Sequence, residues 1–405
     1  MAKTSDDAAR GDKNKLSLNA AWSMAVGGMI GGGIFATLGV VFTVAGQLAW
    51  LSFVIGGAIA LLTAFSYAKL TLHHKESGGV YLYVREEGHI AAARVAVWAL
   101  LIGYTLTVAV YAYTFGAYLS EALNLGSWIR PAAAVAIIAV LCGVNLRGVS
   151  ESAGLEIFVV WAKLVILLVL AVIGLIHWAP AQLEPSQSLG GGESGLLGAV
   201  VGAASVFMAY EGFQLLSYDY EEMRDPDRNV RHGMIWGVIG VIVIYVLVTL
   251  GVAMLVGANE IIKDGEISLA VAGRAAAGEA GFIAVTVAAV FSTASAINAT
   301  VFSAARLAHR AGKHRALPSV FERTIGKNVP WAAIVLISGV AALLALFGGL
   351  DPLVKAASFV FLAVFATVNF FAARLDDKNT WVGWFGFGGA IAAAIVLLLH
   401  MVGVL

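Results

Sequence analysis

Charged residues are scarce in this sequence: they make up 12% of its 405 residues, whereas soluble domains carry about 25%. Apolar residues account for 60% of the chain. This balance excludes an ordinary soluble protein and indicates a protein that crosses a membrane several times. Basic and acidic residues are equal in number, at 25 each, so no excess of positive charge points to a nucleic-acid partner.

Cysteine and proline are also rare. The single cysteine, Cys142, excludes an intramolecular disulfide and a metal site built from cysteines. All seven prolines fall in predicted loops or at the ends of predicted spans, so any helix break inside the membrane has to be made by glycine. No HExxH or GxSxG motif occurs, so no enzyme activity is expected. No TVGYG filter motif supports a channel.

Long runs without charge predict the topology. They predict about eleven spans of roughly 20 residues, two of which contain one charged residue each, Lys163 and Glu211, and no soluble domain is expected between the spans. Most of the 25 lysines and arginines fall in alternate loops, which predicts a cytoplasmic N-terminus. The fold prediction is an all-α, multi-pass protein of the plasma membrane, with a cytoplasmic tail at 1–15 and an additional C-terminal span at 380–405.

Two of the predicted spans are weakened by glycine near their middle. The first contains Gly27, Gly28 and the run Gly31–Gly33, and the sixth contains Glu211 and Gly212 in the stretch FMAYEGFQL. These two spans correspond if the chain consists of two five-helix repeats, the second inverted. Glycine-interrupted spans at matching positions of two halves indicate the binding site of a transporter. The alternative is close packing, because membrane helices use glycine where their backbones approach one another.

A helix unwound at Gly31–Gly33 would leave main-chain groups without partners inside the membrane. Such groups are tolerated only where they are buried in protein or face a wet cavity. Free amides at the start of a half-helix suit a carboxylate, and free carbonyls at the break in the sixth span suit an ammonium group. On this interpretation the two breaks together form a pocket for the zwitterion of an α-amino acid.

Four stretches of the sequence match, in order, the signatures of one transporter family. They are LSLNAAWSMAVGGMIGGGIF, SGGVYLYVREEG, FMAYEGFQLLSYDYEEMRDPDRNVRHGM and FSTASAINATVFSAARLAHRAGKHRALPSVF. In these stretches the chain resembles the amino acid–polyamine–organocation transporter family, in particular its prokaryotic proton-coupled amino-acid transporters of the ApcT type. The resemblance implies a LeuT-like transport core at 16–373. It consists of five-plus-five inverted repeats, about 16–178 and 194–373, with the first and sixth helices broken.

The resemblance also implies where a substrate binds. It assigns the substrate carboxylate to Ile30, Gly31, Gly32 and Gly33, and the substrate amine to Phe207, Ala209, Tyr210 and Gly212. The chain departs from the family pattern in three ways: Gly32 replaces the usual serine or alanine, Arg231 replaces a proline, and eleven spans replace twelve. Gly32 leaves amides but no hydroxyl at this place, and Arg231 is expected to affect only the start of its helix. The missing span is expected to affect oligomeric contacts rather than transport.

Lys163, inside the predicted fifth span, is the candidate for energy coupling. In the ApcT type a lysine at this place takes the position of the sodium ion of sodium-coupled relatives. The resemblance therefore implies that its partners are the Gly27 carbonyl and the hydroxyls of Ser292 and Ser295. A buried lysine changes its protonation state readily. The alternative is that the side chain leans toward the helix N-terminus and reaches the cytoplasmic interface.

Two further residues in the membrane are candidates for the substrate site. Glu211 could bind a positively charged substrate, since an unpaired acid in the membrane is costly and usually functional. It could also bind water, take up a proton or act as a gate. Tyr104, in the middle of the third span, could contact substrate or pack against other helices.

The function predicted from these features is secondary active import of amino acids by proton symport with alternating access. The proton is the expected coupling ion; sodium, a metal site and an organic cofactor are not expected. The expected partners are a small amino-acid substrate and the lipid bilayer. An exchanger of the same fold is the main alternative and a channel the weaker one. The sequence predicts neither which amino acid is carried nor the oligomeric state.

Overall fold

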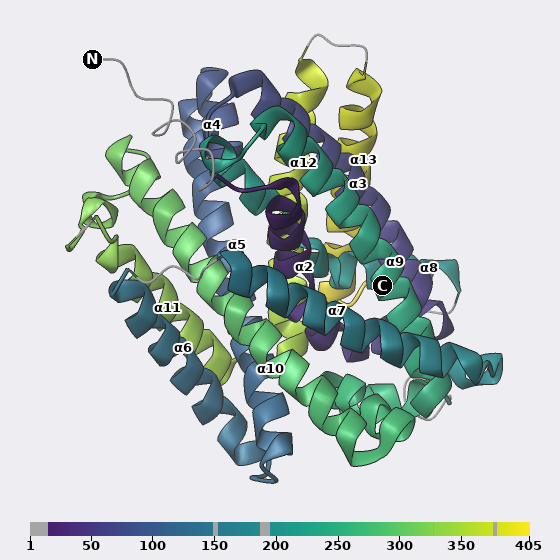
Figure 1. Ribbon diagram of the computed structural model, residues 1–405. Helices are drawn as coiled ribbons and strands as arrows, with labels where there is room; N and C mark the ends of the chain where they lie inside the picture. The colour runs from purple at the N-terminus through teal and green to yellow at the C-terminus, as the bar shows by residue number, and fades with distance from the viewer. Residues whose placement is uncertain (1–14, 149–152, 187–194, 327, 376–378) are drawn as a thin grey trace.

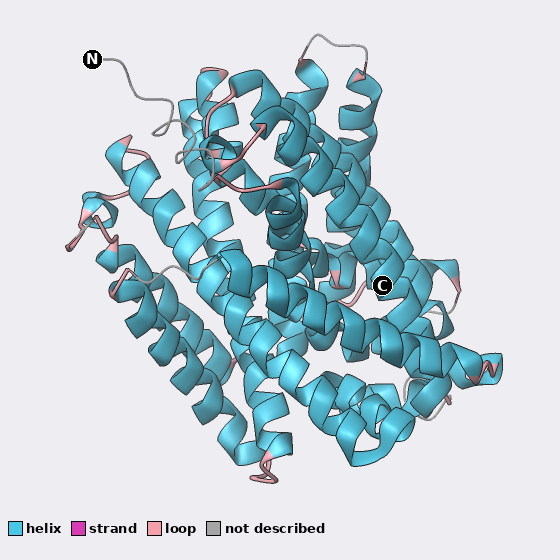
Figure 2. Cartoon of the chain, viewed as in Figure 1, coloured by secondary structure: helices cyan, strands magenta, loops and turns pink. Residues whose placement is uncertain are grey.

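The computed structural model describes residues 15–148, 153–186, 195–326, 328–375 and 379–405, and its regular elements there are helices (Figures 1 and 2). Seven helical stretches are long and apolar enough to cross a membrane. The prediction of an all-α protein is therefore confirmed for the described residues. Of the predicted cytoplasmic tail, residues 1–14 lie outside this part of the chain.

Within the described residues, eleven helices build the body of the protein. They are α2 (Leu18–Ala45), α3 (Ala49–His74), α5 (Ile90–Ala122), α6 (Arg130–Leu146), α7 (Ala153–Ile176), α8 (Leu196–Ser205), α9 (Pro226–Asp264), α10 (Ser268–Lys313), α11 (Trp331–Phe347), α12 (Leu350–Arg374) and α13 (Thr380–Met401). The short helix α4 (Gly79–Glu86) follows α3. The helix α9 is kinked at Gly257, and α10 at Ala277 and Gly278.

The helix α2 lies at the centre of the bundle (Figure 1). It packs against α7, α8, α9 and α10, and most of its residues are buried. A helix that is apolar all round is expected in such a place. The helices α6 and α11 pack together on one flank, and α12 and α13 pack together near α3 on the other. Any site built on α2 is therefore enclosed by protein on several sides.

The start of α2 is tied to the segment that precedes α9. The Leu16 N–H donates to the Glu222 carbonyl at 2.9 Å, and the Arg224 N–H donates to the Leu16 carbonyl at 2.9 Å. The Ser17 side chain accepts from the Ala20 N–H and caps the first turn of α2. These contacts hold the end of α2 beside the loop that follows the sixth predicted span.

The sixth predicted span is broken, as the sequence predicts. The helix α8 ends at Ser205, and the chain continues as two 3₁₀ turns, Phe207–Tyr210 and Phe213–Tyr218. Between the turns Glu211 is extended and Gly212 has a φ angle of 138°. Glycine adopts such a conformation readily and other residues do so rarely.

The predicted break in the first span is wrong for this structure, because α2 is α-helical through Gly31–Gly33. The glycines allow close approach instead. A Cβ atom on any of these three would lie less than 3.0 Å from a side-chain atom of another helix: Ala296 of α10, Tyr111 of α5 or Tyr245 of α9. The alternative interpretation, close packing of glycine, therefore explains the first span as it is seen here.

Candidate functional site

Four successive carbonyl groups of α2, those of Gly27–Ile30, accept hydrogen bonds from side chains of other helices. The donors come from α7, α5, α9 and α10, so four helices converge on one turn of α2. The contacts are Lys163 Nζ to Gly27 O at 3.2 Å, Tyr111 Oη to Gly28 O at 3.5 Å, Tyr245 Oη to Met29 O at 2.7 Å and Ser292 Oγ to Ile30 O at 3.1 Å.

These carbonyls are the helical partners of the predicted carboxylate-binding amides. In an α-helix the N–H of each residue bonds to the carbonyl four residues earlier. The amides of Gly31–Gly33 therefore pair with the carbonyls of Gly27–Met29, and each of those carbonyls has an external donor as well. Opening this turn would free the three amides without leaving the carbonyls unsatisfied, and unsatisfied carbonyls are a major cost of unwinding a helix inside a membrane.

Tyr245 links the two predicted halves of the substrate site. Its hydroxyl lies 2.7 Å from the Met29 carbonyl and 2.8 Å from the Ala209 carbonyl, and its side chain is fully buried. The two backbones also meet directly, because a Cβ atom on Gly28 would lie 2.9 Å from the Gly212 Cα. The structure thus places the predicted carboxylate-binding and amine-binding stretches side by side.

The aromatic side chains of the amine-binding stretch are bound to neighbouring helices. The Tyr210 hydroxyl donates to the Phe53 carbonyl of α3 at 2.5 Å. The Phe207 ring packs edge-on against Phe365 of α12, with ring centroids 5.7 Å apart. These side chains anchor the broken segment, so a ligand at the break would meet the backbone of this stretch.

Glu211 and Tyr104 belong to one buried polar network. Gln214 Nε2 donates to the Glu211 carboxylate at 2.9 Å, and the Gly212 N–H donates to Gln214 Oε1 at 2.8 Å. The Tyr104 hydroxyl lies 3.0 Å from the Tyr218 hydroxyl and accepts from Gln214 Nε2 at 3.5 Å. Gln214 therefore connects the two candidate residues, which come from the sixth and third predicted spans.

Lys163 is buried between α2 and α10. Its Nζ lies 3.2 Å from Gly27 O and 3.0 Å from Ser292 Oγ, and the residue is 4% exposed. An ammonium buried in this way does not reach the protein surface. The Ser292 hydroxyl donates in turn to the Ile30 carbonyl at 3.1 Å. A directional chain of hydrogen bonds therefore joins Lys163 to the substrate-binding stretch of α2.

A cavity of about 410 Å³ reaches Lys163 from the protein surface. At its mouth Arg306 pairs with Asp219 at 3.3 Å and with Glu222 at 3.2 Å. The lining also includes Gly27, Asn145, Glu156, Ser295 and Asn298. The cavity thus offers a polar route from the surface ion pairs to the lysine. Across the described residues, no three His, Cys, Asp or Glu side chains gather as a metal site would require.

Three residues of this site were not predicted from the sequence: Tyr245, Gln214 and Glu156. Tyr245 and Gln214 interrupt the apolar stretches IVIYVLV and GFQLL, which is the same signal that singles out Lys163 and Glu211. Glu156 precedes Lys163 by two helical turns and so shares its face of α7. Its Oε1 lies 3.6 Å from the position that a Cβ atom on Gly27 would take.

The ion pair at the cavity mouth leads to a prediction about pH. Burial raises the pKa of Asp219 from 3.8 to about 6, although Arg306 opposes the shift. The folded state therefore binds a proton at Asp219 more tightly than the unfolded chain does. Protonation of Asp219 stabilises the folded state increasingly as the pH falls from about 7 to 5, and this stabilisation is lost as the pH rises through about 6. As the pH falls over that interval, we expect the free energy of unfolding of wild type to rise by about 1–2 kcal/mol relative to that of Asp219→Asn. Thermal unfolding of both proteins at the two pH values measures this, and parallel pH curves would contradict it.

The chain is similar to known membrane transporters over most of its length. The sequence profile of a family described as amino acid permease matches residues 16–405. The chain is 28% identical to the inner membrane transport protein YbaT of Escherichia coli over 357 residues, which are 87% of this chain and 82% of that protein. It is 26% identical to the methylthioribose transporter of Bacillus subtilis over 375 residues, 88% and 80% of the two chains. It is also 26% identical to the human cystine/glutamate transporter over 356 residues, 86% and 71% of the two chains.

Proposed function

Since this chain belongs to the amino acid permease family, we propose that it imports an α-amino acid together with a proton by alternating access. It is a multi-pass membrane protein and a secondary transporter of amino acids or related solutes, and it is not an enzyme. The inward direction and the coupling proton are the proposed parts of this function. They rest on the geometry around α2 and Lys163.

The proposed topology has eleven membrane crossings in the plasma membrane, with the N-terminus in the cytoplasm. The first inverted repeat consists of α2, α3, α5, α6 and α7. The second consists of the broken sixth segment with α9, α10, α11 and α12, and α13 is an additional span. In this arrangement the broken segment and α2 occupy matching places in the two repeats. The mouth of the cavity that leads to Lys163 then faces the cytoplasm.

The observation that carries the proposal is the set of external donors to the carbonyls of Gly27–Ile30. When the turn opens, these donors keep the carbonyls satisfied, and the amides of Gly31–Gly33 become available to a substrate carboxylate. The substrate ammonium would lie at the break around Gly212, which packs directly against Gly28. An α-amino acid carries both charges at a separation that suits two adjacent backbone sites.

Lys163 would couple this opening to proton movement. A charged ammonium makes stronger hydrogen bonds than a neutral amine, so the protonated side chain holds Gly27 O and Ser292 Oγ more firmly. Loss of the proton into the cytoplasmic cavity weakens both contacts, so the Gly27 carbonyl pairs again with the Gly31 amide, the turn closes and the carboxylate is released. Proton release and substrate release would therefore occur on the same side of the membrane, as symport requires.

Uptake into proteoliposomes with an empty lumen tests this function. An inwardly directed pH gradient should drive saturable accumulation of an amino acid, and a protonophore should abolish that accumulation. An obligate exchanger shows no uptake until the lumen is preloaded with substrate. A channel shows neither saturable uptake nor accumulation against a gradient. Competition by each of the twenty amino acids then identifies the substrate. Failure of every amino acid to accumulate or to exchange would refute the proposal.

A further inference from the structure

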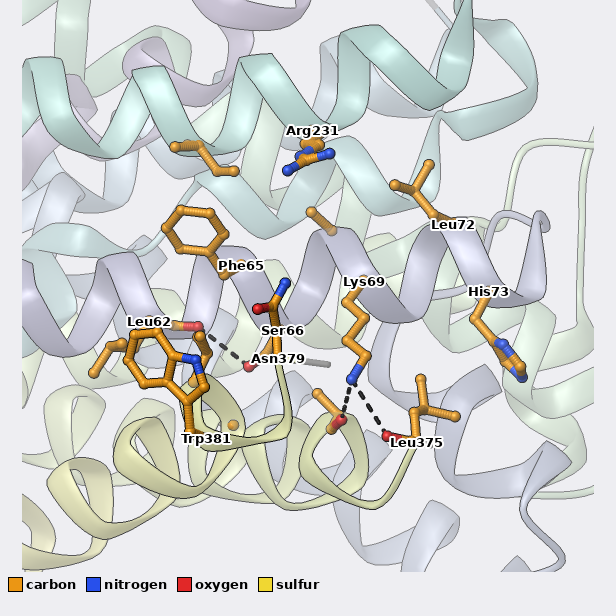
Figure 3. Close-up of a pocket in the computed structure, with 15 residues that line it drawn as sticks. Leu62, Phe65, Ser66, Lys69, Leu72, His73, Arg231, Leu375, Asn379 and Trp381 are labelled. Carbon is orange, nitrogen blue, oxygen red and sulfur yellow. Dashed lines mark hydrogen bonds between the residues drawn. The ribbon is translucent and has the colours of Figure 1, made fainter. Parts of the chain in front are cut away.

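A second cavity, separate from the substrate site, lies between α3, α9, α12 and α13 (Figure 3). Its volume is about 780 Å³, and it opens on the outer surface of the helix bundle. Its walls belong to helices that cross the membrane, so the bilayer is the immediate source of any occupant. Its apolar wall includes Leu62, Phe65, Ile235, Trp381 and Val382.

One end of this groove is basic. Arg231 of α9 and His73 of α3 are both exposed there, and Lys69 lies across the groove from Arg231 (Figure 3). The Lys69 ammonium donates to the Ala372 and Leu375 carbonyls at 3.1 and 3.4 Å, at the end of α12. The described lining contains no aspartate or glutamate. An anion beside Arg231 therefore meets positive charge from α9, while Asp376 and Asp377, which join the lining residues Leu375 and Asn379, lie outside the described residues.

Arg231 is the group in this end that is available to a ligand. Among the residues that the structure describes, its guanidinium has no ion-pair or hydrogen-bond partner. A planar guanidinium matches the oxygens of a phosphate and binds two of them at once. Trp381 lies at the same groove and is exposed, as is common for tryptophan at the level of lipid headgroups.

We propose that this groove binds one anionic phospholipid of the cytoplasmic leaflet. The phosphate lies beside Arg231, and an acyl chain runs along Phe65, Ile235 and Trp381. The charge at one end and the apolar wall along the rest match the two parts of such a molecule, and basic pockets between membrane helices are a known setting for acidic headgroups. The site is independent of proton coupling, because it involves neither Lys163 nor the cavity that leads to it.

Binding of this lipid would brace the helices around the substrate site. The helix α3 holds the broken sixth segment through the bond from Tyr210 to the Phe53 carbonyl. It also carries Phe65 and Lys69 on the groove side. A lipid wedged against α3, α9 and α13 therefore stabilises the scaffold on which that segment rests.

Thermal unfolding of the purified full chain in detergent tests the proposal. Added phosphatidylglycerol should raise the unfolding temperature, and phosphatidylcholine should raise it much less. Arg231→Gln should weaken the response to phosphatidylglycerol at least about tenfold in lipid concentration, because a hydrogen bond to a charged group is lost. Arg94→Gln is the matched control: Arg94 is also exposed near the end of a helix, and its loss should leave the response intact.

A second variant tests the apolar part of the groove. Leu62→Trp should fill it and abolish the response, whereas Leu336→Trp on the exposed face of α11 should not. Native mass spectrometry should show one phosphatidylglycerol retained by wild type and lost from Arg231→Gln. An equal response to phosphatidylcholine, an equal response to inorganic phosphate, or a full response in Arg231→Gln would each overturn the proposal. A groove covered by a second copy of the chain with no lipid retained would do so as well.

Discussion

Replacement of Lys163 by alanine is expected to abolish accumulation driven by a pH gradient. The ammonium is the group that contacts both the Gly27 carbonyl and the Ser292 hydroxyl. Each charge-assisted hydrogen bond contributes about 1.5–3 kcal/mol, so loss of the group that binds the proton should lower uphill uptake at least tenfold. The measurement is uptake of radiolabelled substrate into empty proteoliposomes with an acidic exterior.

Counterflow separates a coupling defect from a folding defect. Exchange of internal for external substrate requires no net movement of protons, so Lys163→Ala should still exchange. Lys163→Met keeps an unbranched chain of similar length without the charge, and it should show the same loss of uphill uptake. Lys313→Ala, at the exposed end of α10, should behave like wild type in both assays. Normal accumulation by Lys163→Ala would show that coupling resides elsewhere.

The two predicted helix breaks, of which the structure has one, show what glycine patterns can and cannot predict. The Glu211-Gly212 pair predicted the sixth break correctly, because an acid inside an apolar span requires a polar environment that a regular lipid-facing helix does not supply. The run Gly31–Gly33 did not predict a break in α2. Glycine removes a side chain in both cases, and the sequence does not reveal whether the space is used for unwinding or for the approach of another helix.

Contacts across the bundle were the least predictable part of the site. The resemblance implied that Lys163 would face Gly27, Ser292 and Ser295. The structure places Gly27 and Ser292 in hydrogen-bond contact with Lys163, and Ser295 lines the same cavity as the lysine. Tyr245 and Gln214 were missed because a polar residue in an apolar span shows only that a partner is needed. Which partner it meets depends on how helices far apart in sequence are arranged, and that information is absent from local patterns.

Replacement of Gly212 by alanine is expected to destabilise the protein more than any other single change near the site. The φ angle of 138° is strained for a residue with a side chain, which costs about 1–3 kcal/mol. The added methyl group would also lie less than 3.0 Å from the backbone of Gly28 and Met29, and overpacking of this kind costs about 1–3 kcal/mol more. We expect a loss of roughly 2–5 kcal/mol in the free energy of unfolding, seen as a lower unfolding temperature and a loss of transport.

Two matched variants separate the causes of this effect. Gly28→Ala places a methyl group against the Gly212 Cα from the opposite side, but within a regular helix, so it should show the cost of overpacking without the cost of backbone strain. Gly339→Ala, on an exposed face of α11 with open space around it, should stabilise its helix by about 0.5–1 kcal/mol. If Gly212→Ala unfolded and transported like wild type, alanine would be compatible with the break. The contact between the two backbones would then be loose enough to admit a methyl group, and the carboxylate-binding and amine-binding stretches could not be held in register by Gly28 and Gly212.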